Sequence, residues 1–392
     1  MFFINHTWKR SRSTRKAGRS SVIRESGTIS NASPYRSRTG YVLHTDGKPL
    51  DALQTFLRDW WAVQDFHAML APVQSPGCCS VFPQVLTDPE QLPGVNPFAP
   101  VLPVNSAGLI DDLLSAYPEG NLAVILRPCE LRTWVEMRKR RADSWGFSDQ
   151  RSDRSRLLLL SVDCPGTLSS VEFAHRAASD GIAALTDEAL DWAAHSRWIN
   201  NRLRQACQNC DWPVPNGADL TIGLLGLDAE QLLLLIPGEK ANGSLKPMEA
   251  LADEPATEDI FLRRYAAAAL VTERHSGHLP GAGHRENGST LGLLATFARC
   301  TMCTDCLDAC PLYDGELAGM LGVPGTSTSS APLLVNLVGV SRWLASCSGC
   351  GMCQDACGQE IPLLNIVLDL NYRMRRELDY RPGDPDLPLP WT

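Results

Sequence analysis

Hydrophobic positions divide the chain into segments of helical period that alternate with short apolar runs. Apolar side chains recur at helical spacing over residues 50–70, which predicts an amphipathic helix. Residues 122–126 and 157–162 are continuous apolar runs, typical of strands buried on both faces. Further helices are expected at 106–117, 131–141, 168–180, 186–205 and 257–271, and further strands at 80–86, 218–225 and 231–236. This alternation predicts an α/β domain with a mostly parallel sheet.

The same pattern predicts four segments. Residues 1–40 are rich in Ser and Arg, and we expect them to form a disordered basic segment. An organellar transit peptide, a basic nucleic-acid arm and a misplaced translation start are alternative interpretations of this segment. Residues 41–271 are the predicted α/β core domain and 272–290 a Gly- and His-rich linker. Residues 291–392 are a second domain, with helices expected at 291–298, 331–345 and 362–378.

Charge is unevenly distributed along the chain. The net charge is −8, but residues 1–40 carry nine Lys or Arg and one acidic residue, so the remainder is near −16. So acidic a body argues against nucleic acid as the main partner. No run approaches the ~18 apolar residues of a membrane span, and no apolar stretch follows the basic start as in a secretory signal. We therefore expect a cytoplasmic protein without a membrane span.

Eight of the fourteen cysteines repeat one pattern near the end of the chain. Each run has three cysteines at intervals of three and a fourth placed four positions later, the spacing of bacterial ferredoxins. In that pattern the fourth cysteine ligates the cluster of the other run. Two [4Fe–4S] clusters are predicted. Their ligands are Cys300, Cys303, Cys306 and Cys357 for the first, and Cys347, Cys350, Cys353 and Cys310 for the second.

Two other interpretations of the eight cysteines are weaker. A zinc site needs only four thiolates, fewer than the two runs supply. A disulfide framework belongs to small secreted chains, whereas this chain has 392 residues.

Four further cysteines occur in the predicted core domain. Cys129 and Cys164 each follow an apolar strand, at the edge where α/β sheets bind ligands. Cys207 and Cys210 form a Cys-x2-Cys pair. The residues alone leave open a third [4Fe–4S] cluster, a zinc site with ligands from elsewhere, and buried inert thiols.

The motifs around these cysteines occur together in one order. They are 85–90, Arg127-Pro128-Cys129-Glu130, Asp163-Cys164-Pro165-Gly166-Thr167, 206–210, 218–223, 347–353, 361–363 and 386–389. In this order the chain resembles the β subunits of coenzyme F420-reducing hydrogenase and formate dehydrogenase, in the branch with a dicluster ferredoxin module. The resemblance covers roughly residues 80–230 and 291–392, and it implies that Cys129, Cys164, Cys207 and Cys210 hold a third [4Fe–4S] cluster.

The chain departs from the family pattern at three places. The second cysteine run ends in Cys357-Gly358 rather than Cys-Pro, but this Pro is not a ligand, so the cluster is still expected. Flavin-binding members have a Gly-containing segment early in the core domain, whereas residues 41–75 contain only Gly47, so FAD belongs to an alternative interpretation. The step from Cys310 to Cys347 is long for a compact βαββαβ ferredoxin. We expect instead an α-helical dicluster ferredoxin domain, similar to those of succinate dehydrogenase and heterodisulfide reductase.

The resemblance implies an iron–sulfur electron-transfer subunit that relays electrons between the core cluster and the two C-terminal clusters. Its expected partner is a catalytic redox subunit, such as the formate dehydrogenase α subunit or a hydrogenase- or heterodisulfide-reductase-type subunit. The alternatives are a flavin-dependent oxidoreductase acting on coenzyme F420 or a similar carrier, and a zinc-stabilised interaction protein. Arg127, Glu130 and Arg132 flank Cys129, and we expect them to be exposed charges on a helix.

Overall fold

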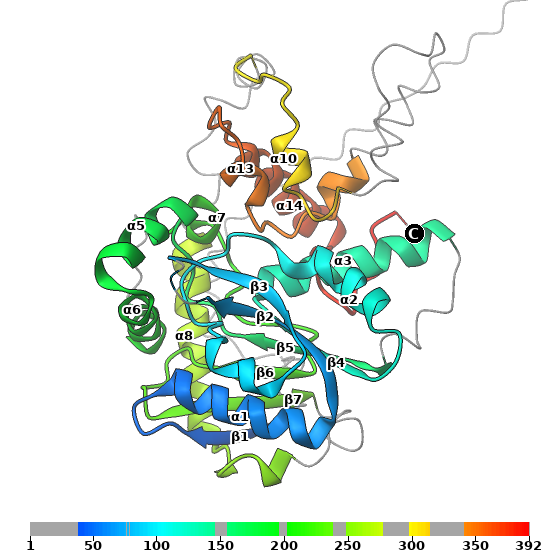
Figure 1. Cartoon of the computed structure of the whole chain (residues 1–392). Helices are drawn as coiled ribbons and strands as arrows, with labels where there is room; N and C mark the ends of the chain where they lie inside the picture. Colours follow the sequence, from blue (N-terminus) through cyan, green and yellow to red (C-terminus); the bar gives the residue numbers. More distant parts are fainter. Residues whose placement is uncertain are drawn as a thin grey trace, which may run out of the picture. The chain divides into compact units, whose positions relative to one another are not determined.

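The computed structural model describes residues 38–75, 77, 79–145, 155–195, 202–237, 248–276, 298–313 and 341–391. An eight-stranded sheet of order β3-β2-β4-β5-β6-β7-β1-β8 organises residues 38–276 (Figure 1). The strands are β1 (Arg38–His44), β2 (Phe66–Gln74), β3 (Val81–Leu86), β4 (Asn121–Leu126), β5 (Leu157–Val162), β6 (Leu220–Gly223), β7 (Gln231–Pro237) and β8 (Glu254–Pro255). The helices beside the sheet are α1 (Pro49–Gln64), α2 (Ile110–Ala116), α3 (Pro128–Trp145), α5 (Ser170–Asp180), α6 (Ile182–His195), α7 (Gln205–Gln208) and α8 (Glu258–Ser276). The C-terminal part has α10 (Asp305–Asp308), α13 (Met352–Asp355) and α14 (Leu363–Leu378).

The sheet is mixed. Its four central strands, β2, β4, β5 and β6, are parallel, which confirms the expected α/β core. The flanking pairs β2–β3, β6–β7, β7–β1 and β1–β8 are antiparallel. The connection 224–230 between β6 and β7 is too short for the crossover helix that parallel neighbours require.

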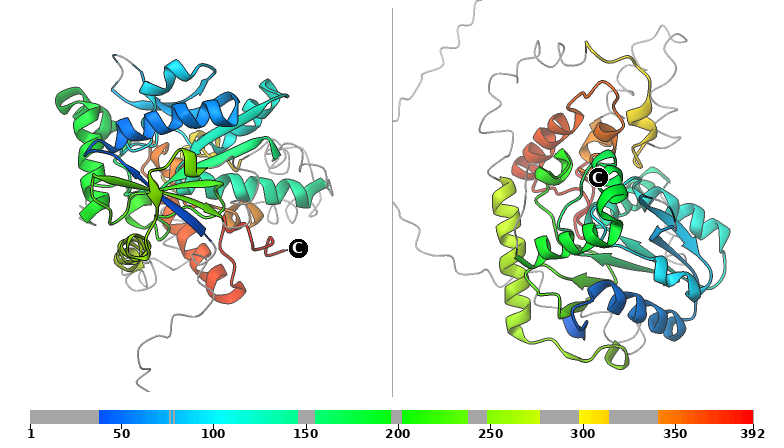
Figure 2. Two further views of the ribbon diagram at one scale, coloured as in Figure 1. Left: turned by 90° about the horizontal axis from the view of Figure 1, so that it is seen from below. Right: turned by 60° about the vertical axis from the view of Figure 1, so that its left-hand side comes forward.

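Helices cover both faces of the central strands. In β4, Ala123 and Ile125 pack with α1 in one apolar cluster. The alternate residues Leu122, Val124 and Leu126 pack with α2 and α3 in another (Figure 2). Burial on both faces explains why β4 and β5 are continuous apolar runs.

Two strands lie where the hydrophobic pattern predicted other structure. The helix expected over 50–70 ends at Gln64, because Asp65 adopts a left-handed conformation and its N–H bonds the carbonyl of Trp61. The chain then reverses into β2, the first part of which the pattern assigned to the helix. Residues 38–40 belong to β1 and not to the predicted disordered segment, whose other residues lie outside the described ranges.

The remaining elements agree in part with the sequence prediction. α14 coincides with the helix expected at 362–378. α8 reaches Ser276, inside the predicted linker. The rest of that linker, the predicted helix at 291–298 except its last residue, and residues 331–340 lie outside the described ranges. Among the described helices, none combines the length and apolar character needed to span a membrane.

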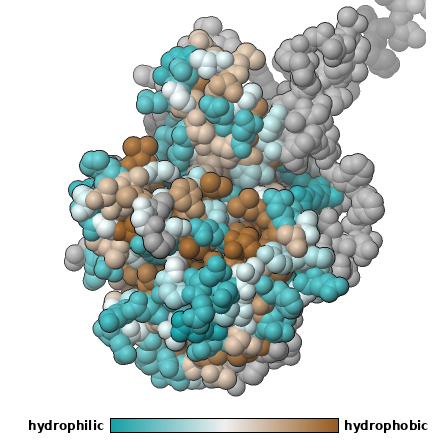
Figure 3. All heavy atoms as spheres, in the orientation of Figure 1, coloured by the Kyte–Doolittle hydropathy of each residue, from teal (hydrophilic) through white to brown (hydrophobic). Residues whose placement is uncertain are grey.

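Several large apolar side chains are exposed on and near the edge strand β3. The face seen in Figure 3 is mostly hydrophilic in its lower part, and apolar residues gather across its middle. Phe82 and Val85 of β3 and the nearby Val104 are among the exposed large apolar residues. Pro83 interrupts this edge, because it has no N–H to donate to a further strand.

A polar stripe on α3 holds the C-terminal part against the core. Arg132 donates to the carbonyl of Ser348 at 3.1 Å and 3.3 Å. Arg140, two turns further along, donates to the carbonyl of Leu312 at 2.8 Å. Between them Glu136 is fully buried. The helix is therefore fixed to both ferredoxin runs through polar groups.

Candidate functional site

All four core cysteines line one cavity at the carboxyl edge of the central strands. Cys129 lies in the first turn of α3, directly after β4, and Cys164 follows β5. Cys207 lies in α7, and Cys210 follows this short helix. Cys350, from the second ferredoxin run, also borders the cavity. The structure thus brings together the four residues that the resemblance implies as ligands.

A buried carboxylate next to Cys164 fixes the end of β5. Asp163 accepts hydrogen bonds from Arg264 Nε at 2.8 Å and Nη2 at 2.5 Å. It also accepts from the backbone N–H groups of Leu224 at 3.1 Å and Leu225 at 3.3 Å. This carboxylate ties β5 to the end of β6 and to α8, so the position of Cys164 depends on all three elements.

The charged residues around Cys129 are buried, and the prediction of exposed charges is wrong. Arg127, Glu130 and Arg132 are between 4% and 7% exposed. Glu130 accepts from the backbone N–H of Arg127 at 2.8 Å and of Ser106 at 2.7 Å, so it caps the start of α3. Arg132 is inside because the C-terminal part, far away in sequence, covers it, whereas Arg127 and Glu130 bond to Ala99 and Ser106 of the core.

Polar side chains contact three of the four core sulfurs. Hydrogen bonds to a thiolate sulfur stabilise its ionised form and tune the potential of a metal bound there. The contacts are Arg127 Nη1 to Cys164 Sγ at 3.5 Å, Thr167 Oγ1 to Cys207 Sγ at 3.2 Å, and Arg132 Nη2 to Cys210 Sγ at 3.9 Å. The contact of Thr167 was not predicted, although this residue belongs to the motif that contains Cys164.

Burial controls the protonation of the core thiols. It raises the pKa of Cys129 well above the usual value, with a further increase from Glu130 and an opposing effect of Arg132. Burial also raises the pKa of Cys210, which Arg132 again opposes. Without metal these groups are therefore neutral thiols, because a buried thiolate loses its solvation. A cationic metal core would reverse this preference, since thiolate ligation displaces the proton.

Arg204 adds an unused donor to the same cavity. Its side chain is 3% exposed, and the residue borders the cavity together with the four cysteines. Its Nε finds no hydrogen-bond acceptor within the described residues. An anionic group held by the four cysteines would satisfy this donor, so the site fits a [4Fe–4S] cluster. Arg204 was not among the predicted site residues, because no known motif marks an arginine three positions before a cysteine.

The two ferredoxin runs share one backbone conformation. Met302 and Gly349 occupy equivalent positions with φ of 57° and 71°. Their N–H groups each donate to the first sulfur of their run at 3.4 Å. Thr304 and Gly351 follow at equivalent positions with φ of 70° and 78° and begin α10 and α13. The repeated sequence pattern is therefore also a repeated structure.

The fourth cysteine of each run lies beside the other run. Burial raises the pKa of Cys306, and Cys357 is the next largest cause. Burial and then Cys350 raise the pKa of Cys310 to about 11. Burial, Cys350 and Cys310 raise the pKa of Cys353 to about 12. Because such repulsion between thiolates weakens with distance, these groups are neighbours. Their role as metal ligands stays a prediction.

The spacing of these thiols differs from that of a single-ion site. In the part of the chain that the structure describes, no three His, Cys, Asp or Glu side chains converge closely enough to hold one metal ion. Thiolates around one zinc ion lie about 3.8 Å apart, given a Zn–S bond of ~2.3 Å and tetrahedral geometry.

The first run stores backbone strain at Met302, which predicts a stabilising substitution. Its side chain is 79% exposed, so little packing would be lost on truncation. A left-handed residue other than glycine costs about 1–2 kcal/mol, and the greater flexibility of glycine in the unfolded chain offsets about half of this. We expect Met302→Gly to raise the free energy of unfolding by about 0.5–1 kcal/mol, measured by urea denaturation. A loss of stability would show that the side chain makes contacts that its exposure conceals.

Comparison with known proteins identifies a curated relative of this chain. The F420-dependent formate dehydrogenase subunit beta of Methanocaldococcus jannaschii is 26% identical over 196 residues, 47% of this chain and 51% of that protein. The chain thus matches about half the length of this curated relative. No family model matches the chain.

One solved structure has a chain whose fold is weakly similar to that of this chain. A chain of the F420-reducing [NiFe] hydrogenase complex from Methanosarcina barkeri has a TM-score of 0.44 and 11% identity, over 62% of this chain and 90% of that one. A TM-score this low carries no argument about function. The formate dehydrogenase relative confirms the resemblance that the motifs predicted, because its name is that of the formate dehydrogenase β subunits that the chain resembles.

Proposed function

We propose that the chain is an iron–sulfur electron-transfer subunit of a formate dehydrogenase- or hydrogenase-type complex. It holds three [4Fe–4S] clusters, one in the α/β core and two in a helical ferredoxin domain. The proposed ligands are Cys129, Cys164, Cys207 and Cys210 in the core, and the two ferredoxin sets that exchange Cys310 and Cys357.

The observation that carries this proposal is that the fourth cysteine of each run lies beside the cysteines of the other run. Among charged groups, Cys357 raises the pKa of Cys306 most, and Cys350 raises the pKa of Cys310 most. A zinc site or an inert thiol does not require two runs to exchange one residue each. A dicluster ferredoxin does, because each cube takes its fourth ligand from the other run.

The side chains around the sulfurs have two tasks. When bound, a [4Fe–4S] cluster accepts and releases a single electron at a potential set by its surroundings. Burial by residues such as Leu102 and Met352 excludes water from Cys129 and Cys350. Hydrogen-bond donors, among them Trp343 Nε1 at 3.4 Å from Cys310 Sγ, stabilise negative charge on the thiolates.

The partner that we propose is a catalytic redox subunit, as the name of the formate dehydrogenase relative suggests. The free thiols of the described cysteines are compatible with the reducing cytoplasm that we propose as its location. Residues 41–271 are the proposed core domain and 291–392 the proposed ferredoxin domain, joined by the segment 272–290.

The metal content of anaerobically purified protein tests the proposal. Three cubes require about twelve irons and as many acid-labile sulfides per chain. We expect Cys129→Ala to lower both counts by about four, since a core cube would lose a ligand in a buried site. Cys79→Ala is the matched control, because Cys79 is exposed and belongs to none of the three sets. Zinc without sulfide, or an iron count that Cys129→Ala leaves unchanged, would contradict the core site.

A second candidate function is a flavin-dependent oxidoreductase that acts on coenzyme F420 or a similar carrier. A separate cavity at the carboxyl ends of β2, β4 and β5 favours it. This cavity is lined by Pro72, Leu126 and Arg127, and Arg127 also contacts Cys164 Sγ. A flavin there would lie one side chain away from the core cysteines. Release of one FAD per chain on denaturation would support this function, and flavin-free protein with full iron content would support the relay alone.

A further inference from the structure

Two buried arginines lie between the core cysteine site and the second ferredoxin site. The core site comprises Cys129, Cys164, Cys207 and Cys210, and the second site comprises Cys310, Cys347, Cys350 and Cys353. We propose that Arg132 and Arg204 serve both sites at once, so that the two sites share one pair of positive charges and have linked reduction potentials. This inference rests on the proposed electron-transfer function and goes beyond it, because it assigns residues that tune two sites together.

Arg204 contacts both sites with one guanidinium group. On the core side it borders the cavity that Cys129, Cys164, Cys207 and Cys210 line. On the other side its Nη2 donates to the carbonyl of Cys350, and its Nη1 pairs with Asp355 Oδ2 at 2.6 Å. Asp355 lies two residues after Cys353, so this ion pair fixes the guanidinium beside the second site.

Arg132 makes an equivalent set of contacts from α3. Its Nη2 lies 3.9 Å from Cys210 Sγ and also donates to the carbonyl of Ser348 at 3.1 Å. Ser348 stands between Cys347 and Cys350. Nη1 donates to the carbonyl of Trp212 at 3.2 Å, and the guanidinium lies over the indole ring at 5.6 Å from its centroid. These contacts leave the side chain little freedom to move away from either site.

The seam between the two sites has no room for water at its closest point. A Cβ atom built on Gly351 would lie 2.3 Å from Ala206 Cβ, so the two chain segments touch directly. Cys129 and Met352 pack in one apolar cluster on the same seam. Charge effects are stronger where water is excluded. Both arginines are nearly buried, so water screens their charges less than it would at the surface.

The charges of the arginines and of the clusters decide the direction in which the reduction potentials shift. Four thiolates and the core that they hold carry net negative charge, which becomes more negative on reduction. Guanidinium groups stay positive at any working pH. A positive charge beside a site stabilises its reduced form and raises its reduction potential. Loss of either arginine should lower the potentials of the core site and of the second site, because its side chain contacts both.

A redox titration followed by EPR spectroscopy tests this inference, with dithionite supplying one electron to each site. In Arg204→Met we expect two of the three midpoints to shift to more negative values. In Arg204→Lys, which keeps the charge, these midpoints should return toward the wild-type values. Asp355→Asn removes a negative charge from the same pair, so here we expect a shift in the positive direction. Opposite shifts from two substitutions in one ion pair cannot result from a loosened structure.

Arg176→Met is the matched control, because Arg176 also forms a close ion pair, with Glu188 at 2.6 Å, but on α5 and α6. It should leave all three midpoints unchanged. Shifts of the same sign in Arg204→Met and Asp355→Asn, or a shift confined to one midpoint, would overturn the inference. The wild-type protein is titrated first. Absence of iron–sulfur signals there would contradict the proposed function itself and not only the role of the arginines.

Discussion

Replacing Gly351 by alanine is expected to separate the second ferredoxin run from the core and to destabilise the protein by about 2–5 kcal/mol. Gly351 has φ of 78°, a left-handed conformation that costs alanine about 1–2 kcal/mol. The added Cβ would also lie 2.3 Å from Ala206 Cβ, next to Cys207. Relief of this overlap requires movement of the backbone, since neither methyl group can rotate away, at a cost of about 1–3 kcal/mol. Urea denaturation of anaerobic protein measures the loss.

Gly349→Ala is the matched control, because it measures the cost of the left-handed backbone conformation alone. Gly349 has a similar φ of 71°, but its added Cβ would meet nothing closer than Leu368 Cδ2 at 3.8 Å. We expect it to cost about 1–2 kcal/mol, from conformation alone. If the two substitutions cost the same, close contact with Ala206 does not constrain the seam. Iron content should fall in Gly351→Ala and remain near the wild-type count in Gly349→Ala.

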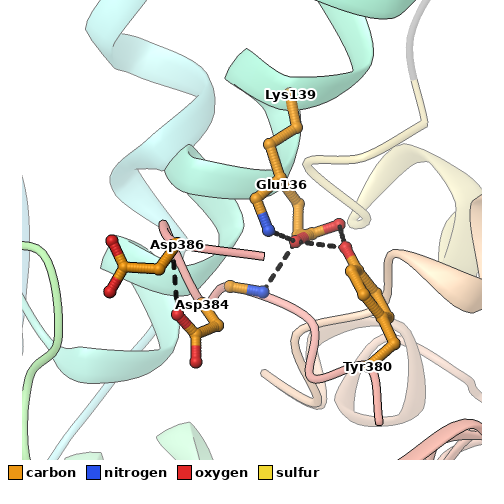
Figure 4. Close-up of polar contacts among 6 residues, drawn as sticks. Glu136, Lys139, Tyr380, Asp384 and Asp386 are labelled. Atoms are coloured by element: carbon orange, nitrogen blue, oxygen red, sulfur yellow. Dashed lines mark hydrogen bonds and ion pairs between the residues drawn. The ribbon is translucent and has the colours of Figure 1, made fainter. Parts of the chain in front are cut away.

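Replacing Glu136 by alanine is the second substitution with a large expected effect. Glu136 is fully buried on α3, and its carboxylate accepts from Tyr380 Oη at 2.8 Å and from the backbone N–H of Gly383 at 2.7 Å (Figure 4). Lys139 Nζ pairs with it at 3.0 Å. Removing the carboxylate leaves a mostly buried ammonium group and two other donors without their acceptor. Breaking a buried pair in this way costs about 3–5 kcal/mol.

Two further substitutions serve as comparisons for Glu136→Ala: Tyr380→Phe removes one donor of the network, and Glu377→Ala removes an exposed carboxylate outside it. Tyr380→Phe removes one donor to a charged acceptor and should cost about 1.5–3 kcal/mol. Burial and the charge of Glu136 raise the pKa of Tyr380, so its hydroxyl remains a donor across the working range. Glu377 pairs only with Arg376 among the contacts described, and both are mostly exposed, so Glu377→Ala should leave the unfolding curve nearly unchanged. A Glu136→Ala protein as stable as Glu377→Ala would show that the network does not hold the C-terminal segment.

Hydrophobic period predicted the centre of the fold well. β4, β5, β6 and β7 lie where continuous apolar runs indicated strands, because strands buried on both faces leave that signature. β2 was missed because its apolar residues continue directly from the amphipathic helix α1, and a single residue, Asp65, separates the two. β1 was missed because it is defined by its pairing with β7, a strand far away in the sequence.

The candidate site divides in the same way. Cysteine spacing indicated the two ferredoxin sets, since each run is local and repeated. The core set came from a resemblance, because Cys129, Cys164 and Cys207 are far apart in sequence and meet only where β4, β5 and α7 meet. Arg132 was predicted to be exposed but is buried, because Ser348 of the C-terminal part, which covers it, lies more than two hundred positions later.

By itself the sequence predicted the kind of chemistry, since thiolates at a fixed local spacing indicate iron–sulfur clusters. It also determined the α/β class, because apolar runs and helical periods are local properties of the chain. Only the tertiary structure decided which groups share a seam: Arg132 and Arg204 lie between two sets of cysteines, and Gly351 lies against Ala206. The physical reason is that packing and charge act between segments distant in sequence, whereas sequence patterns record only what neighbours along the chain require.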